Sequence, residues 1–182
     1  GPWLVDKFKK ITSFGIPKGF YFSVYLYTDR KQFQKVLNLE ASDRTYGISC
    51  WTGGSIIAPI HTMDDLDVMT HEMVHSIQWA AYKSFPLFFT EGMANWLAHS
   101  YTHSTRNVSK FYRGANIQVL ARQIRSGGFP EMESYLACEN YDDWEKLLGS
   151  KWKGYHIGAM LCDYLFTHHQ VWVGRALQHC QQ

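Results

Sequence analysis

Two histidines four residues apart, inside an amphipathic stretch, constrain this chain more than any other feature of its sequence. Around His71 and His75, apolar residues recur with a spacing of three to four: Leu66, Met69, Met73, Ile77 and Ala80. This period predicts a helix from Met63 to about Tyr82. Positions four apart differ by only ~40° around a helix axis and ~6 Å along it, so both imidazoles would lie on one face. The two rings can therefore reach a single ion.

The residues from His71 to His75 read H-E-M-V-H, and a further acid, Glu91, stands sixteen positions after the second histidine. Glu72 would lie at the flank of the histidine face, where its carboxylate can contact a water on the ion without binding the ion. Glu91 would lie on a following helix, and Gly92 would let the two helices pack closely. Catalytic zinc takes three protein ligands and keeps one position for water. We therefore predict one zinc ion per chain on His71, His75 and Glu91.

Ordinary explanations compete with this interpretation. Glu91 on its own would be an exposed acid at the start of a helix, and only its combination with the two histidines makes it a ligand candidate. His99 and His103 also stand four apart, but no glutamate lies between them and no third ligand follows. We therefore predict that these two are surface histidines rather than a second metal site.

Three segments before the histidine helix have the composition of strands. Phe20–Tyr27 is dense in aromatic and β-branched residues, and Tyr46–Trp51 and Ser55–Ile60 are separated by a T-G-G turn. A pair of glycines permits the positive φ angles of a tight hairpin. Pro59 cannot donate a ladder hydrogen bond, so its strand is expected to end there or to lie at the edge of the sheet.

The remaining pattern is helical. Asp29 can cap a helix that carries Phe33, and Pro86 precedes the helix of Glu91. Further helices are expected at Val108–Arg125, Tyr141–Leu148, Trp152–His168 and Val173–His179. We predict an α+β fold, with a small N-terminal mixed sheet and edge hairpin, the zinc-binding helix, and a mostly helical C-terminal part. The chain is expected to be one domain, with the sheet and zinc helix in residues 1–85 and the helical lobe in residues 86–182.

Composition limits the classes of protein that the chain can be. Its 182 residues are 46% hydrophobic and 19% charged, which indicates a packed core rather than disorder. A formal charge of +2 argues against a nucleic-acid partner, and the basic residues between Arg106 and Arg125 are better explained as a solvated helix face. No apolar run approaches the ~18 residues of a membrane helix. The four cysteines contain no C-x-x-C pair, and either disulfides or buried thiols remain possible.

The chain resembles the gluzincin metallopeptidases, in which H-E-x-x-H is followed by a helix that bears E-G-x-A. It is most similar to the small peptidase-MA-like domains, through Pro86, the segment from Phe88 to Trp96, the segment Phe129–Leu136, and Tyr155–Leu161. The resemblance covers roughly residues 21–178. One departure is Asn95, because the thermolysin-like branch has an aspartate there; an amide oxygen can still accept an imidazole N–H but adds no charge.

The resemblance implies a zinc peptidase with Glu72 as general base. It also suggests Tyr155 as a hydrogen-bond donor to the oxyanion, since the aminopeptidase branch places a tyrosine three residues before a helix glycine, with His156 as the alternative. A peptide or protein substrate would pair as an extended strand with an edge at Ser55–Ala58 or Ser49–Trp51. We favour an endopeptidase, because the G-G-S sequence before the zinc helix supplies no acid for a free amine.

Two other functions remain open at this point. The chain could be a zinc-stabilised binding module without catalysis, although the retained Glu72 argues against that, since a structural site needs no general base. It could also be an effector protease with a single protein target. The substrate, the compartment, any further domains and the oligomeric state are not determined by the sequence.

Overall fold

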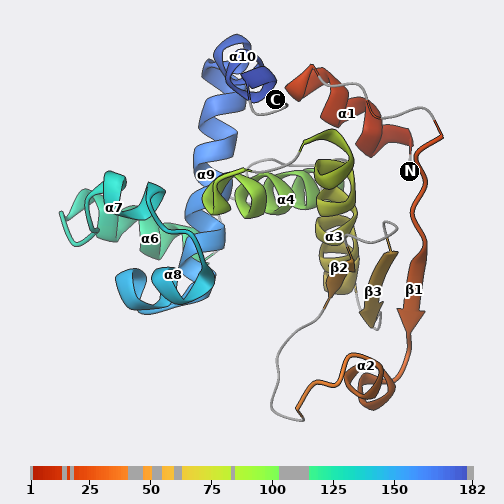
Figure 1. Ribbon diagram of the computed structural model, residues 1–182. Helices are drawn as coiled ribbons and strands as arrows, with labels where there is room; N and C mark the ends of the chain where they lie inside the picture. Colours follow the sequence, from red (N-terminus) through yellow and green to blue (C-terminus); the bar gives the residue numbers. More distant parts are fainter. Residues whose placement is uncertain are drawn as a thin grey trace.

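The computed structural model describes residues 2–13, 16, 19–40, 47–50, 55–59, 63–82, 85–102 and 115–179 (Figure 1). Most of these residues are helical, which confirms the prediction of a mostly helical C-terminal part. Within these ranges, none of the helices combines the length and the apolar character that a membrane crossing requires.

Most of the helices agree with the periodic pattern. They are α1 (Pro2–Thr12), α2 (Arg30–Val36), α3 (Met63–Ala81), α4 (Leu87–Thr102), α6 (Ala115–Arg125), α7 (Met132–Leu136), α8 (Tyr141–Leu148), α9 (Lys151–His168) and α10 (Gln170–His179). The bounds of α3, α8 and α9 match the predictions to within one residue. The predicted helix that contains α6 starts at Val108, and residues 108–114 lie outside the described ranges.

Two helices were missed by the sequence reasoning, α1 and α7. The signal for α1 was present, because its buried residues Leu4, Phe8 and Ile11 recur at helical spacing. The five residues of α7 are too few for such a pattern to stand out. At α2 the predicted cap is confirmed, since the Asp29 carboxylate accepts a hydrogen bond from the backbone N–H of Lys31.

Three short strands pair in the order β1-β3-β2, with β1 at Val24–Tyr27, β2 at Ile48–Cys50 and β3 at Ser55–Pro59. The central strand β3 is parallel to β1 and antiparallel to β2. The prediction that Ser55–Ala58 is an edge is therefore wrong, because β1 covers the side that the hairpin leaves open. β2 is the edge on the other side of β3 and lies beside α3. β3 ends at Pro59 as expected, and the T-G-G turn at 52–54 lies outside the described residues.

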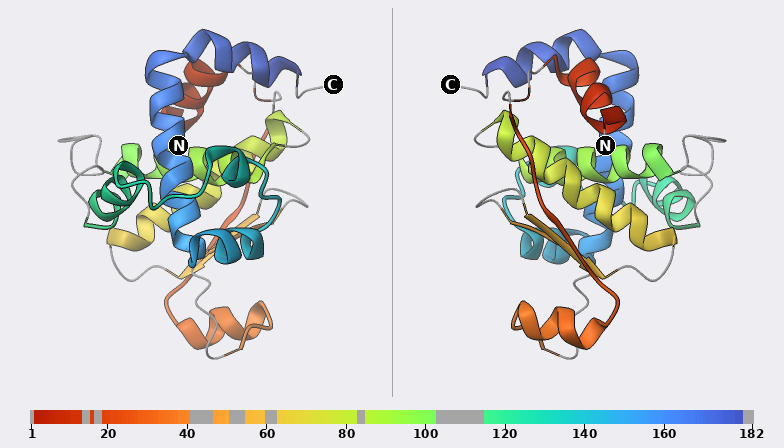
Figure 2. Two further views of the ribbon diagram at one scale, coloured as in Figure 1. Left: turned by 90° about the vertical axis from the view of Figure 1, so that its left-hand side faces the viewer. Right: turned by 90° about the vertical axis from the view of Figure 1, so that its right-hand side faces the viewer.

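The core has two parts, which α9 connects. The larger cluster joins residues of α1, α3, α4, α9 and α10, including Phe8, Ile77, Met93, Phe166 and Leu177. The smaller cluster packs under α6, α7 and α8 and contains Tyr135, Trp144 and Ile157. Figure 2 shows α1 lying beside α10 at one end of the molecule, and Figure 1 shows α3 along the sheet with α4 between α3 and α9.

Two glycines bring α4 and α9 into backbone contact. A Cβ atom on Gly92 would lie 2.4 Å from the carbonyl carbon and oxygen of Gly158. Gly92 therefore does permit close helix packing, but its partner is α9 rather than the predicted histidine helix α3. This contact places Glu91 of α4 next to the N-terminal half of α9.

The cysteine question is answered for two of the four residues. Cys138 and Cys162 are buried free thiols. The side chain of Cys50 and all of Cys180 lie outside the part of the chain that the structure describes.

Candidate metal centre

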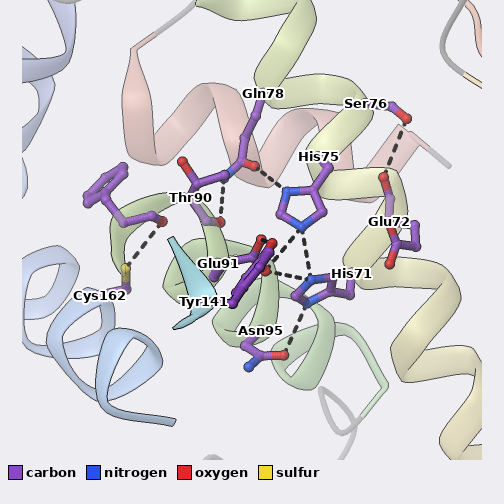
Figure 3. A network of polar contacts seen from close by, with 11 residues as sticks. His71, Glu72, His75, Ser76, Gln78, Thr90, Glu91, Asn95, Tyr141 and Cys162 are labelled. Carbon is purple, nitrogen blue, oxygen red and sulfur yellow. Dashed lines mark hydrogen bonds and ion pairs between the residues drawn. The ribbon is translucent and has the colours of Figure 1, made fainter. Parts of the chain in front are cut away.

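The two histidines of α3 and Glu91 of α4 converge on one point (Figure 3). The Nε2 atoms of His71 and His75 are 2.9 Å apart, and Glu91 Oε2 lies 3.0 Å from the first and 3.3 Å from the second. Ligands at the 2.0–2.1 Å bond lengths of zinc stand ~3.3 Å apart at the corners of a tetrahedron. Shifts of a few tenths of an ångström would therefore let all three atoms bind one ion.

Each imidazole is oriented by an amide oxygen at its other nitrogen. His71 Nδ1 lies 3.0 Å from Asn95 Oδ1, and His75 Nδ1 lies 2.8 Å from Gln78 Oε1. The Gln78 amide is itself fixed, since its Nε2 donates to the carbonyl of Thr90. Because an amide oxygen only accepts, each Nδ1 donates its proton to the amide, and each Nε2 faces the ligand position, where it can bind an ion or hold a proton.

These hydrogen bonds leave three potential ligand atoms facing one another. Two imidazole nitrogens and a carboxylate oxygen within about 3 Å are stabilised by positive charge between them, which a bound metal ion or, without one, a proton on an imidazole can supply. The chemistry of the donor set therefore fits a metal ion. The role of Asn95 was predicted, whereas that of Gln78 was missed, although its position three residues after His75 on the same helix could have indicated it.

The charges of the site agree with cation binding. Glu91 is 4% exposed. Burial by itself would raise the pKa of Glu91, but the two imidazoles outweigh it and hold that pKa well below its usual range. Burial would likewise lower the pKa of His75, but the Glu91 and Glu72 carboxylates raise it to about 9. The buried carboxylate thus stays negative and attracts positive charge to this point.

Tyr141 is a member of the site that sequence reasoning did not find. Its hydroxyl donates a short hydrogen bond to Glu91 Oε1, the carboxylate oxygen turned away from the histidines. Burial raises the pKa of Tyr141, and the Glu91 carboxylate raises it further, so the phenol keeps its proton. The sequence carries no signal for this contact, because the two residues are fifty positions apart and on separate helices.

Glu72 lies beside His71 and against the edge strand β2. Its side chain is 9% exposed, and burial raises its pKa, although the neighbouring imidazoles and the backbone N–H of Ser49 act in the opposite direction. A Cβ atom on Gly47 would lie 2.9 Å from Glu72 Cγ and 3.1 Å from Oε1. The lack of a side chain at residue 47 therefore leaves room for the Glu72 carboxylate.

A cleft of about 660 Å³ opens over these groups. Its walls come from β2, α3, the start of α4, and the lobe of α8 and α9: Gly47, Ile48, Ser49, Trp79, Phe85, Glu139, Tyr141, Lys151 and Tyr155 are among the lining residues. The β2 strand of the β2–β3 hairpin thus borders the cleft. Trp79 and Phe85 add apolar surface to the same cleft.

Tyr155 and His156, the two oxyanion candidates, differ in position. Tyr155 lines the cleft, with its ring centre 6.0 Å from that of His71 and 5.8 Å from that of Tyr141. Burial raises the pKa of Tyr155, and the Glu91 charge adds to the effect. His156 is half-buried and is not among the residues that line the cleft, and burial lowers its pKa. Tyr155 is therefore the better placed of the two.

The second histidine pair forms no comparable group among the described residues. His99 is half-buried on α4, with Nδ1 3.9 Å from a carboxylate oxygen of Asp67. It therefore lies deeper than the predicted surface position. His103 falls outside the described ranges. Within those ranges, His71, His75 and Glu91 are the residues that come close enough to share one metal ion.

Comparison of the chain with protein-family models, curated proteins and solved structures finds no match. What the geometry of the site establishes is a buried group, His71, His75 and Glu91, that could hold a metal ion.

Proposed function

We propose that this chain is a zinc-dependent peptidase of the gluzincin type that acts as an endopeptidase. The observation that carries the proposal is the convergence of His71 Nε2, His75 Nε2 and Glu91 Oε2 within 3.3 Å of one another, with the Glu72 carboxylate beside them in an open cleft. A structural zinc site is normally closed by four protein ligands. Three ligands next to a non-ligating acid favour catalysis.

Zinc suits this donor set better than other common ions. Magnesium and calcium prefer oxygen ligands, whereas two imidazoles and one carboxylate are a set that zinc takes in catalytic sites. When bound, zinc would lower the pKa of a water molecule toward neutrality and polarise the carbonyl group of the substrate.

Glu72 would move the proton. Burial raises its pKa above that of an ordinary glutamate, and a base with a higher pKa accepts a proton more readily. Its carboxylate would accept a proton from the attacking water and then deliver it to the nitrogen of the leaving amine. The backbone N–H of Ser49 donates a hydrogen bond to that carboxylate. The absence of a side chain at Gly47 leaves room for the carboxylate beside His71.

Tyr155 would support the developing negative charge on the carbonyl oxygen. Its raised pKa keeps the phenol protonated at neutral pH, so the hydroxyl remains a donor. A hydrogen bond from a fixed donor becomes stronger as the charge on the oxygen grows, which favours the transition state over the bound substrate.

The substrate would bind as an extended strand along β2. This strand is an edge of the sheet, and its residues Gly47, Ile48 and Ser49 line the cleft. In this proposal the small mixed sheet binds the substrate, because its edge strand β2 would offer backbone N–H and C=O groups to a peptide beside the metal centre. Main-chain pairing of this kind accepts many sequences.

The decisive experiment compares wild-type protein with Glu72→Gln and His75→Ala. The assay follows zinc content and cleavage of a diverse library of peptides with blocked ends. Glu72→Gln should keep its zinc and lose hydrolysis by roughly 10²–10⁴-fold, because glutamine cannot accept the proton. His75→Ala should lose the metal as well as the activity.

Two results would count against the proposal. Full activity in Glu72→Gln would exclude the proposed proton transfer. A wild-type protein that binds zinc but cleaves no peptide with blocked ends would favour the zinc-stabilised binding module or an effector with a single protein target. Cleavage confined to peptides with a free amino terminus would identify an aminopeptidase instead.

A further inference from the structure

Tyr141 connects the metal-binding residues to the lobe of α8 and α9. Its hydroxyl donates to Glu91 Oε1, while Oε2 of the same carboxylate lies 3.0 Å from His71 Nε2 and 3.3 Å from His75 Nε2. A charge-assisted hydrogen bond to one carboxylate oxygen restricts rotation of the whole group. The bond from Tyr141 therefore keeps Oε2 directed at the two imidazoles.

Tyr141 is itself held in place by the structure of α8. It is the first residue of that helix, directly after the cap Asn140, whose side chain accepts from the backbone N–H groups of Asp142 and Asp143 at 3.0 Å each. The Asp143 carboxylate completes a capping box by accepting from the N–H of Asn140. The Tyr141 ring also stacks on Tyr155, with an interplanar angle of 10°. The hydroxyl thus has a defined position.

We propose that Tyr141 is a positioning residue, which holds the Glu91 carboxylate with one oxygen turned toward the metal-binding position and so makes α8 a part of the metal centre. The inference rests on the metal centre of the proposed function, but it does not depend on whether the chain hydrolyses peptides. It assigns a role to the α8 lobe that the H-E-x-x-H pattern and Glu91 alone do not imply.

The test is Tyr141→Phe, which removes only the hydroxyl. Tyr141 is 39% exposed, so loss of the oxygen should not disturb the buried core. Zinc affinity, measured by competition with a chromophoric chelator, should fall by roughly ten- to a hundredfold, as for other hydrogen-bond partners of metal ligands. The visible spectrum of the cobalt(II)-loaded protein should also change, because a differently placed carboxylate alters the ligand field. A purely structural contact would leave that spectrum as it is.

Tyr164→Phe is the matched control. Tyr164 lies on α9, is 54% exposed, and shares its own hydroxyl hydrogen bond with His169, away from the cleft. The same atom is removed in both variants, and circular dichroism checks that both keep the fold. Only Tyr141→Phe should affect zinc affinity and the cobalt spectrum.

A second variant tests whether the effect comes through α8. Asn140→Ala removes the cap and loosens the first turn of the helix, which carries Tyr141. It should weaken zinc binding less than Tyr141→Phe does. In the double variant it should add nothing, because the hydroxyl through which it acts is already absent.

The outcomes separate this inference from the proposed function. Zinc affinity of Tyr141→Phe within about twofold of wild type, or an equal loss in Tyr164→Phe, would overturn the positioning role while leaving peptidase activity standing. If the wild-type protein bound zinc without cleaving any peptide, the proposed function would fail, and the affinities would still decide the role of Tyr141. A wild-type protein that bound neither zinc nor cobalt would overturn both.

Discussion

Replacing Gly92 with alanine would insert a methyl group between the backbones of α4 and α9. The new Cβ atom would lie 2.4 Å from the carbonyl carbon and oxygen of Gly158 and 2.8 Å from its Cα atom. Ordinary contacts between such atoms begin at about 3.4 Å, so the two helices would have to separate by ~1 Å. No side chain can move aside to relieve the contact, since all three neighbouring atoms belong to the backbone.

Two effects of opposite sign determine the change in stability. Alanine is favoured over glycine inside a helix by about 0.5–1 kcal/mol. Overpacking of a tight core costs typically 1–3 kcal/mol, and a clash between two backbones belongs at the upper end of that range. We therefore expect Gly92→Ala to lower the free energy of unfolding by about 2 kcal/mol.

The same displacement should weaken metal binding. Gly92 follows the candidate ligand Glu91, and α8, which carries Tyr141, packs against α9, so separation of α4 from α9 would move the carboxylate relative to the Tyr141 hydroxyl. We expect zinc affinity to fall together with stability. A change of stability without any change of zinc affinity would show that this close approach serves the core alone.

The assay is urea unfolding followed by circular dichroism, with zinc affinity measured on the folded protein. Gly128→Ala is the control, because a Cβ atom there would meet its nearest neighbours at 3.6 Å, an ordinary contact. It should leave both quantities nearly unchanged. If Gly92→Ala were as stable as this control, the inferred backbone contact between α4 and α9 would be incorrect.

Two further substitutions test the catalytic proposal. Tyr155→Phe should lower kcat by roughly 10²–10³-fold with KM little changed, because its hydrogen bond is made mainly in the transition state; steady-state kinetics on a cleaved peptide would measure this, and full activity would exclude the oxyanion role. Gly47→Ala should displace Glu72, since the new Cβ atom would meet its Cγ at 2.9 Å. We expect kcat to fall by about ten- to a hundredfold while zinc affinity is retained, and an unchanged kcat would show that Glu72 tolerates the methyl group.

Local patterns in the sequence were sufficient for most of the helices and for the candidate ligand set. The apolar period of α3 and the four-residue spacing of His71 and His75 are properties of one helix, so they do not depend on the rest of the fold. The cap at Asp29 and the bounds of α8 are local in the same way. Glu91 could be named because it follows the histidines on the next helix, at a distance that a short connection can close.

The contacts that only the tertiary structure decided join residues far apart in the chain. Placement of β3 in the centre of the sheet depends on parallel pairing with β1, and the partner of Gly92 proved to be Gly158. The contact of Tyr141 with Glu91 is of the same kind. A residue's own sequence neighbourhood determines its helix and the face on which it lies, whereas the packing of the whole core determines which distant face it meets. For this reason the sequence indicates the three candidate ligands, and the folded chain alone reveals the tyrosine that donates a hydrogen bond to one of them.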